Sequence, residues 1–259
     1  MSNEIAVELR GHMATVAINR PERLNAMTLD MYRAFGAAFE ELGNDDSVRC
    51  IVVQGAGERA FCTGSDIFEF GSSRLGVDQA KAYAVLANGA TDKLRYCRHP
   101  TVAKVAGLCI GGGLEIASMC DIRICSSDSN FGLPANRIGL TVDYEELDVL
   151  YELVGRRAAL EILLEGRIFG ADEALRLQLV SRVVDRPDLD DEVDQTAQRI
   201  AERAPLSNRW HKAFVRRLAD RRPVTAAERE EAYKCFLTED YREGTAAFRE
   251  KRRPQFVGR

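Results

Sequence analysis

A single carboxylate, Glu115, follows three consecutive glycines within the apolar segment CIGGGLEIASMC (109–120). A buried carboxylate is costly unless it is paired, hydrogen-bonded or protonated. A glycine inside a regular element costs about 0.5–1 kcal/mol relative to alanine. Because both costs fall in one place, the segment predicts a functional site. A carboxyl group in apolar surroundings is suited to proton transfer near neutral pH.

Two turns of similar design could bind a developing negative charge. The segments AFCTGSDIFEF (60–70) and GLCIGGGLEIA (107–117) each read as a buried strand, a glycine-bearing turn and a helix start. N–H groups at a helix start lack an intrahelical partner and carry partial positive charge. Two of them aimed at one point form an oxyanion hole, worth about 3–4 kcal/mol per donor. The alternative for the triplet is a packing turn, because it matches neither GxGxxG nor a P-loop.

Alternating strand and helix patterns position these turns. Residues 5–19 predict two strands joined at Arg10–Gly11–His12, and residues 28–43 predict a helix that starts at Thr28. Further strands are expected in VRCIVVQGAG, PTVAKVAG, DIRICSS and LVSRVV, with helices at 77–97 and after the glycine triplet. This order predicts an α/β fold with a helix-covered sheet. The C-terminal third is expected to be helical, with breaks at Pro205 and Pro223.

Composition excludes several classes of function. The 259 residues carry a net charge of −4, which disfavours nucleic acid as a partner. No stretch reaches about 18 uninterrupted apolar residues, so no membrane span is expected. The seven cysteines form no CxxC pair, so a metal site is not expected. A reducing, cytoplasmic location is expected.

The chain resembles the crotonase superfamily, the enoyl-CoA hydratase/isomerase family. The resemblance covers nearly the whole chain, in the family's order, through these stretches: INRPERLNAMTLDM (17–31), RAFCTGSDIFEF (59–70), VAGLCIGGGLEIASMCDIRIC (105–125), FGLPANRIGL (131–140), RIFGADEALRLQLVSRVV (167–184) and EGTAAFREKRRPQF (243–256). It implies a spiral of repeated ββα units, an acyl-CoA thioester ligand and a homotrimer or hexamer. A core at 1–200 and a helical trimerisation extension at 201–259 are expected.

The resemblance also implies roles for individual residues. The N–H groups of Ser65 and Gly112 would form the oxyanion hole. The residues implied to contact coenzyme A are Glu22, Arg23, Leu24, Ser65, Asp66, Ile67, Lys251 and Phe256. The last two belong to a segment that, in the family, often reaches a ligand on a neighbouring subunit. A solvated surface arginine is the alternative for Arg23, and ordinary tail packing is the alternative for Phe256.

The sequence departs from the family pattern at its second catalytic glutamate. Glu115 matches the glutamate that activates water, but the other position is Ala135. Asp143 falls where the family's dienoyl-CoA isomerases and chlorobenzoyl-CoA dehalogenase carry a catalytic aspartate. It could also cap the helix that follows. Tyr144, Glu145 and Glu146 are expected at the surface, in the first turn of that helix.

We therefore expect an enzyme that stabilises a thioester enolate and moves protons with Glu115 and Asp143. Hydration or double-bond isomerisation is expected, with no cofactor beyond the coenzyme A of the substrate. The alternatives are other crotonase chemistry (hydrolysis, decarboxylation or C–C cleavage) or a non-catalytic acyl-CoA-binding subunit. Ala135 keeps the last alternative open, and Glu115 argues against it.

Overall fold

Two sheets form the centre of the computed structural model, which describes residues 4–259. The larger sheet has the strand order β1-β2-β3-β5-β7-β10. Its strands are β1 (Ile5–Arg10), β2 (Met13–Ile18), β3 (Cys50–Gly55), β5 (Thr101–Val105), β7 (Ile122–Ser126) and β10 (Arg182–Val184). All neighbours are parallel except the predicted β1–β2 hairpin. A smaller sheet contains β4 (Ala60–Cys62), β6 (Leu108–Ile110), β8 (Asn130–Gly132) and β9 (Phe169–Gly170).

The chain builds both sheets by repetition. Each repeat gives one strand to the larger sheet and the next strand to the smaller sheet, and a helix follows. The pairs β3–β4, β5–β6 and β7–β8 all obey this rule. The predicted spiral of ββα units is therefore confirmed. Strands β4 and β6 lie where a buried strand was predicted before each glycine-bearing turn. Strands β8 and β9 were not predicted, because strands of two or three residues are too short to show an alternating pattern.

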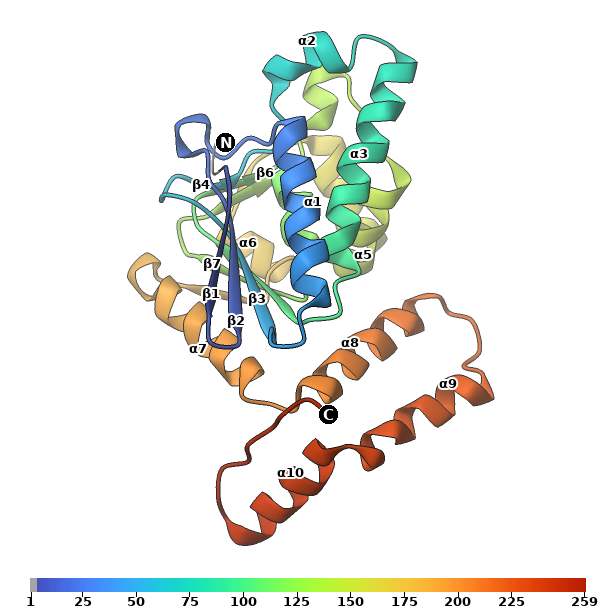
Figure 1. Ribbon diagram of the computed structural model, residues 1–259. Coiled ribbons are helices and arrows are strands. Elements are labelled where there is room, and N and C mark those ends of the chain that lie inside the picture. The colour runs from blue at the N-terminus through green and yellow to red at the C-terminus, as the bar shows by residue number, and fades with distance from the viewer. Residues whose placement is uncertain (1–3) are drawn as a thin grey trace.

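Two long helices cover one face of the larger sheet. Helix α1 (Leu29–Asn44) begins where predicted, since the Thr28 side chain accepts a hydrogen bond from the Met31 N–H at 3.2 Å. Its apolar stripe, which includes Phe35 and Phe39, is fully buried. Helix α3 (Val77–Arg95) lies beside α1 (Figure 1). Helix α3 also contacts α4 (Gly112–Met119), which begins at the second glycine-bearing turn.

Shorter elements connect the repeats around this layer. Helix α5 (Tyr144–Glu165) is kinked at Gly155, whose φ is +71°. The remaining elements of this part of the chain are η1 (Pro21–Arg23), η2 (Ile67–Glu69), α2 (Phe70–Ser73), η3 (Ala135–Ile138), α6 (Ala171–Arg176) and η4 (Arg186–Asp188). Helix α4 contacts both α3 and α5. Residues on α5 can therefore reach the glycine-bearing turns.

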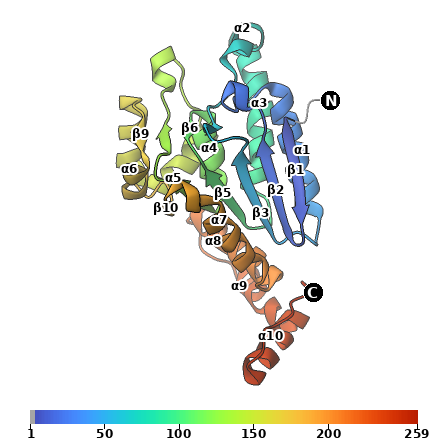
Figure 2. The same ribbon diagram turned by 90° about the vertical axis from the view of Figure 1, so that its left-hand side faces the viewer.

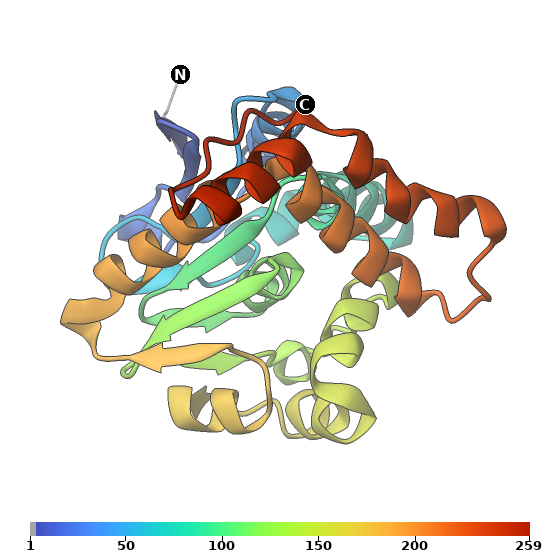
Figure 3. The same cartoon turned by 90° about the horizontal axis from the view of Figure 1, so that it is seen from below.

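The C-terminal helices leave the body of the molecule. Helix α7 (Leu189–Ala201) still packs on the larger sheet, where Leu189 and Val193 join a second apolar cluster with Val52 and Val102. The helices α8 (Pro205–Ala219), α9 (Ala226–Glu231) and α10 (Glu239–Glu250), with η5 (Ala232–Leu237), project away from it (Figures 1 and 2). In the view from below, this orange and red layer lies in front of the strands (Figure 3). Its predicted role in trimerisation stays a prediction.

None of the helices within residues 4–259 combines the length and the apolar character that crossing a membrane requires.

Candidate functional site

The two glycine-bearing turns lie against each other. Gly64 has a φ of +90°, and a Cβ added to it would lie 2.9 Å from the backbone nitrogen of Gly112. Any side chain at position 64 would therefore push the turns apart. Ser65 follows Gly64, and Gly112 is the first residue of α4. Neither the Ser65 nor the Gly112 N–H has an acceptor within residues 4–259, so both remain available to a ligand.

Glu115 lies one helical turn after Gly112. Its Oε2 atom is 3.4 Å from the place that a Cβ on Gly112 would occupy, so the carboxyl group stands directly behind the turn. A part of the Glu115 residue is accessible to solvent, but protein atoms surround its carboxyl group closely. Burial, and next the carboxyl group of Glu146, raise the pKa of Glu115 well above 4.5. The raised pKa favours the protonated form of Glu115.

Glu146 is the functional candidate that the sequence analysis missed. It was expected at the surface with Tyr144 and Glu145. Those two residues are exposed, but Glu146 is half-buried and its carboxyl group hydrogen-bonds to that of Glu115. Burial, followed by the charge of Asp143, raises the pKa of Glu146 as well. The hydrogen bond lowers the pKa of Glu146 and raises that of Glu115, so a proton held by the pair is favoured on Glu115.

A signal for Glu146 was present in the sequence. Val149 and Leu150 are buried in α5, and they follow Glu146 by three and four residues. Residues at this spacing share one face of a helix. Glu146 therefore belongs to the face that packs on α4, while Glu145 points to solvent.

Asp143 caps α5 at its N-terminus. Its Oδ1 accepts a hydrogen bond from the Glu146 N–H at 3.1 Å, and its Oδ2 accepts one from the Asn88 side-chain amide at 2.7 Å. Both oxygens are thus engaged, and capping, one of the two roles considered for this residue, is present. A catalytic role for Asp143 stays a prediction. The cap places Asp143 where its charge acts on both glutamates.

Ala135 begins η3 and packs partly buried against the main apolar core. It offers no group that could transfer a proton. Where the family pattern takes its second carboxyl group from this position, the structure places the Glu146 carboxyl group of α5 beside Glu115 instead.

The residues predicted to contact the nucleotide end of coenzyme A gather on two neighbouring loops. Arg20 joins these loops through a 2.7 Å ion pair with Asp66, which is 6% exposed. The Arg23 guanidinium lies 5.3 Å from the centre of the Phe68 ring. The other predicted residues of the two loops are Glu22 and Ile67, which are exposed, and Leu24, whose φ is +53°. This arrangement leaves a cationic and apolar surface open to solvent.

Lys251 and Phe256 lie elsewhere in the protomer. Lys251 ends α10, and Phe256 packs against Gly244 of the same helix. The Phe256 carbonyl accepts a hydrogen bond from Arg49 at 2.7 Å. Helix α10 lies at the opposite end of the molecule from α2 (Figure 1). Within one chain these two residues are not brought to the glycine-bearing turns, and their contact with a neighbour's ligand stays a prediction.

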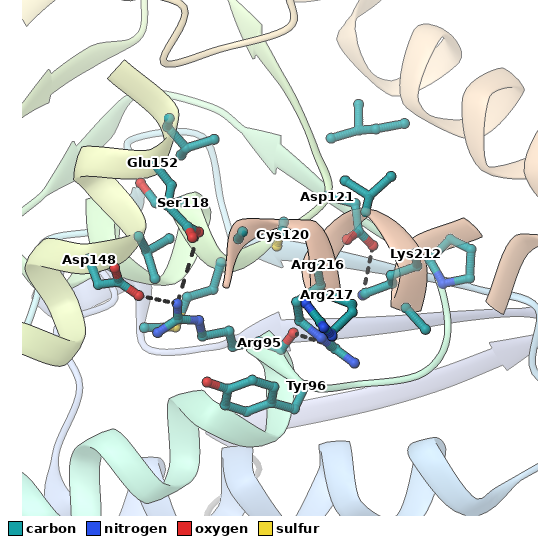
Figure 4. Close-up of a pocket in the computed structure, with 18 of the residues that line it drawn as sticks. Arg95, Tyr96, Ser118, Cys120, Asp121, Asp148, Glu152, Lys212, Arg216 and Arg217 are labelled. Atoms are coloured by element: carbon teal, nitrogen blue, oxygen red, sulfur yellow. Dashed lines mark hydrogen bonds and ion pairs between the residues drawn. The ribbon is translucent and has the colours of Figure 1, made fainter. Parts of the chain in front are cut away.

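A large cleft is separate from this site. It has a volume of about 1450 Å³ and lies between the C-terminal end of α4, α5 and α8 (Figure 4). Its charged groups pair with one another, as in the Arg95–Asp148 contact at 2.5 Å and the Lys212–Asp121 contact at 2.7 Å. None of the predicted catalytic or coenzyme A-binding residues lines it. We therefore place the candidate active site at the two glycine-bearing turns rather than in this cleft.

Comparison with known proteins agrees with this geometry. The sequence model of the family described as Enoyl-CoA hydratase/isomerase matches residues 8–259. The chain belongs to the enoyl-CoA hydratase/isomerase family. The predicted crotonase resemblance, fold and enzyme class are thereby confirmed.

Relatives of this family member are similar over their full length. A short-chain-enoyl-CoA hydratase from Clostridium acetobutylicum is 34% identical, over 97% of this chain and 96% of its own. A crotonyl-CoA hydratase from Syntrophomonas wolfei is 31% identical, over 98% of each chain. A crystal structure described as an enoyl-CoA hydratase/carnithine racemase from Magnetospirillum magneticum has 47% identity and a TM-score of 0.98, over 100% of this chain and 97% of its own.

This member of the enoyl-CoA hydratase/isomerase family is an enzyme of that type, and an acyl-CoA thioester is its class of substrate.

Proposed function

We propose that the enzyme adds water reversibly to an α,β-unsaturated acyl-CoA, with Glu115 and Glu146 as its acid/base pair. The observation that carries this proposal is the hydrogen bond between the two carboxyl groups beside the Gly112 turn. A pair that holds one proton contains a carboxylate and a carboxylic acid together. Hydration needs both, because a base must activate water and an acid must protonate the α-carbon.

The proposed step balances its protons within the pair. The water oxygen bonds to the β-carbon while one carboxylate takes the proton that water loses. The electron pair of the double bond moves toward the thioester oxygen, which becomes enolate-like. The N–H groups of Ser65 and Gly112 stabilise that oxygen, at about 3–4 kcal/mol per donor. The carboxylic acid then gives its proton to the α-carbon, so the pair ends with one proton, as it began.

The coenzyme A portion is proposed to bind across the loops of Arg23 and Asp66, with Glu22, Leu24, Ser65 and Ile67. This proposal is supported by the exposed Arg23 and Phe68 side chains on a rigid Arg20–Asp66 frame. Coenzyme A enters as part of the substrate, and we expect no further cofactor, because hydrogen bonding and proton transfer supply the chemistry.

A homotrimer or hexamer is proposed to form through α8–α10. This layer exposes large apolar side chains, and such patches mark interaction surfaces. They are Val215, Leu218, Tyr233, Phe236, Leu237, Tyr241 and Phe248. Assembly would bring Lys251 and Phe256 of one protomer toward a neighbour's ligand. Light scattering at micromolar concentration tests this, and a monomer would contradict it.

We also propose a cytoplasmic location. This proposal is supported by the seven cysteines, all of which are unpaired, because disulfides are rare in the reducing cytoplasm.

Double-bond isomerisation is the second candidate, because a shared proton can also be taken from one carbon and returned to another. Incubation with enoyl-, dienoyl- and β-hydroxyacyl-CoAs in heavy-oxygen water separates the two. Hydration predicts a β-hydroxyacyl product that carries the label. A shifted double bond without label would establish isomerisation in its place.

A further inference from the structure

A guanidinium group that has no carboxylate partner among the described residues lies beside the proposed oxyanion hole. The charged carbon of Arg74 is 3.5 Å from the centre of the Tyr83 ring and 4.3 Å from that of Phe70. One terminal nitrogen of Arg74 donates a hydrogen bond to the Ser65 hydroxyl at 3.3 Å. The aromatic rings therefore orient the cation toward the residue whose N–H is proposed to hold the thioester.

The hydrogen bonds of Arg74 are incomplete. Its Nε atom is buried and has no acceptor within the part of the chain that the structure describes. Arg74 also forms no ion pair with a carboxylate there, and the Ser65 hydroxyl is a neutral acceptor. A guanidinium offers five donors in a planar fork that suits a carboxylate. A buried cation without a counter-charge is costly, so this arrangement favours binding of an anion.

The nearby acidic side chains do not neutralise Arg74 by forming an ion pair with it among the described residues. Glu115 and Glu146 hydrogen-bond to each other, and the positive charge of Arg74 acts on both of them without an ion pair among residues 4–259. Asp143 is already held by Asn88 and by the backbone of Glu146. Among residues 4–259, the guanidinium thus keeps donors that are not paired with a carboxylate.

We propose that Arg74 binds a second carboxylate on the acyl group, so that the preferred substrates are thioesters of short dicarboxylic acids. This inference rests on the proposed function, because it assumes that the thioester lies against Ser65 and Gly112. The carboxylate would take the two parallel hydrogen bonds that the Arg74 fork offers. The buried hydroxyl of Tyr83, which lies next to Ser65 and Arg74, adds a donor nearby.

Equilibrium binding to unreactive, saturated thioesters tests the proposal without requiring turnover. Glutaryl-CoA and valeryl-CoA have acyl chains of equal carbon number and differ in a terminal carboxylate against a methyl group. Succinyl-CoA and butyryl-CoA form a second pair. We expect the wild-type protein to bind the diacid member of at least one pair about 10- to 100-fold more tightly, as a charge-assisted hydrogen bond predicts.

Two variants show whether Arg74 is responsible. Arg74→Met keeps the apolar stem and should remove the preference for the diacid while valeryl-CoA binds as before. Arg23→Met, the matched control on the nucleotide side, should weaken both members of a pair equally. If Arg74→Met does not fold, the wild-type comparison still tests whether the site prefers a diacid. Equal wild-type affinity within each pair, with turnover of crotonyl-CoA intact, would overturn the role of Arg74 and leave the proposed function standing. Absence of binding by every thioester would instead contradict the proposed function.

Discussion

The carboxyl group of Glu115 on α4 hydrogen-bonds to that of Glu146 on α5, next to the glycine turn that begins α4. Two acids in contact cannot both ionise near neutral pH without strong repulsion. The pair therefore supplies an acid and a base at one place, although the family's usual second position is Ala135.

Replacement of Glu146 tests its part in the pair. Glu146→Gln keeps the shape but cannot accept a proton, so kcat/KM for enoyl-CoA hydration should fall by about 10²–10⁴-fold. Glu145→Gln is the matched control, because Glu145 is adjacent in the same helical turn and exposed. It should stay within about twofold of the wild type, as expected for a surface change away from the site. Equal activity of both variants would remove Glu146 from the mechanism.

Glu115→Gln should lower activity and raise stability. The folded pKa of Glu115 lies well above its ordinary 4.5, so the stability that this group contributes is present below pH 4.5 and is lost as pH rises toward the folded pKa. Glutamine removes that loss. Turnover should fall by about 10²–10⁴-fold. Urea unfolding should show little difference between variant and wild type near pH 4.5 and a more stable variant at pH 8. A variant that is less stable at pH 8 would contradict the raised pKa.

Two substitutions separate capping from catalysis at Asp143. Asparagine caps a helix about as well as aspartate, whereas alanine costs about 1 kcal/mol. If Asp143 positions Glu146 by capping α5, Asp143→Asn should retain hydration within a few-fold and Asp143→Ala should lose both rate and stability. A large rate loss in Asp143→Asn with unchanged thermal unfolding would show that the carboxylate itself takes part.

The working carboxyl groups differ in how readily the sequence reveals them. Glu115 could be predicted because it is the only acid in an apolar run and stands two residues after three consecutive glycines. Glu146 could not be assigned with the same ease, because acids are common in the first turn of any helix. Its orientation depends on how α5 packs against α4, which is a tertiary contact between distant segments.

The same distinction applies to the fold. Helix α1 was predictable from its Thr28 cap and the regular spacing of Met31, Phe35 and Phe39. Strands β8 and β9 of the smaller sheet were not, because they contain two or three residues and are defined by pairing rather than by local sequence. Arg74 could not be predicted as a site residue for a similar reason, since nothing in its sequence neighbourhood indicates that it packs on Tyr83 and reaches Ser65.

His99 predicts a pH dependence of stability unrelated to catalysis. It is fully buried, and burial, with nearby Arg209 and Arg98, lowers its pKa to about 4. Between pH 6.5 and 4 the unfolded chain binds a proton that the folded chain does not, so stability should fall as pH falls through this window. In denaturant titrations, His99→Phe should show a shallower decline than the wild type. Identical slopes would contradict the lowered pKa.

Infrared difference spectroscopy at neutral pH tests the shared proton most directly. Ordinary carboxyl groups are ionised there, so the C=O stretching band of a protonated acid isolates the Glu115–Glu146 pair. We predict that the wild type shows this band near pH 7, that the band shifts in heavy water, and that Glu115→Gln removes it while Glu145→Gln leaves it unchanged. A wild-type spectrum without a protonated-carboxyl band at neutral pH, or a band that survives in Glu115→Gln, would contradict the proposal that these two glutamates share one proton.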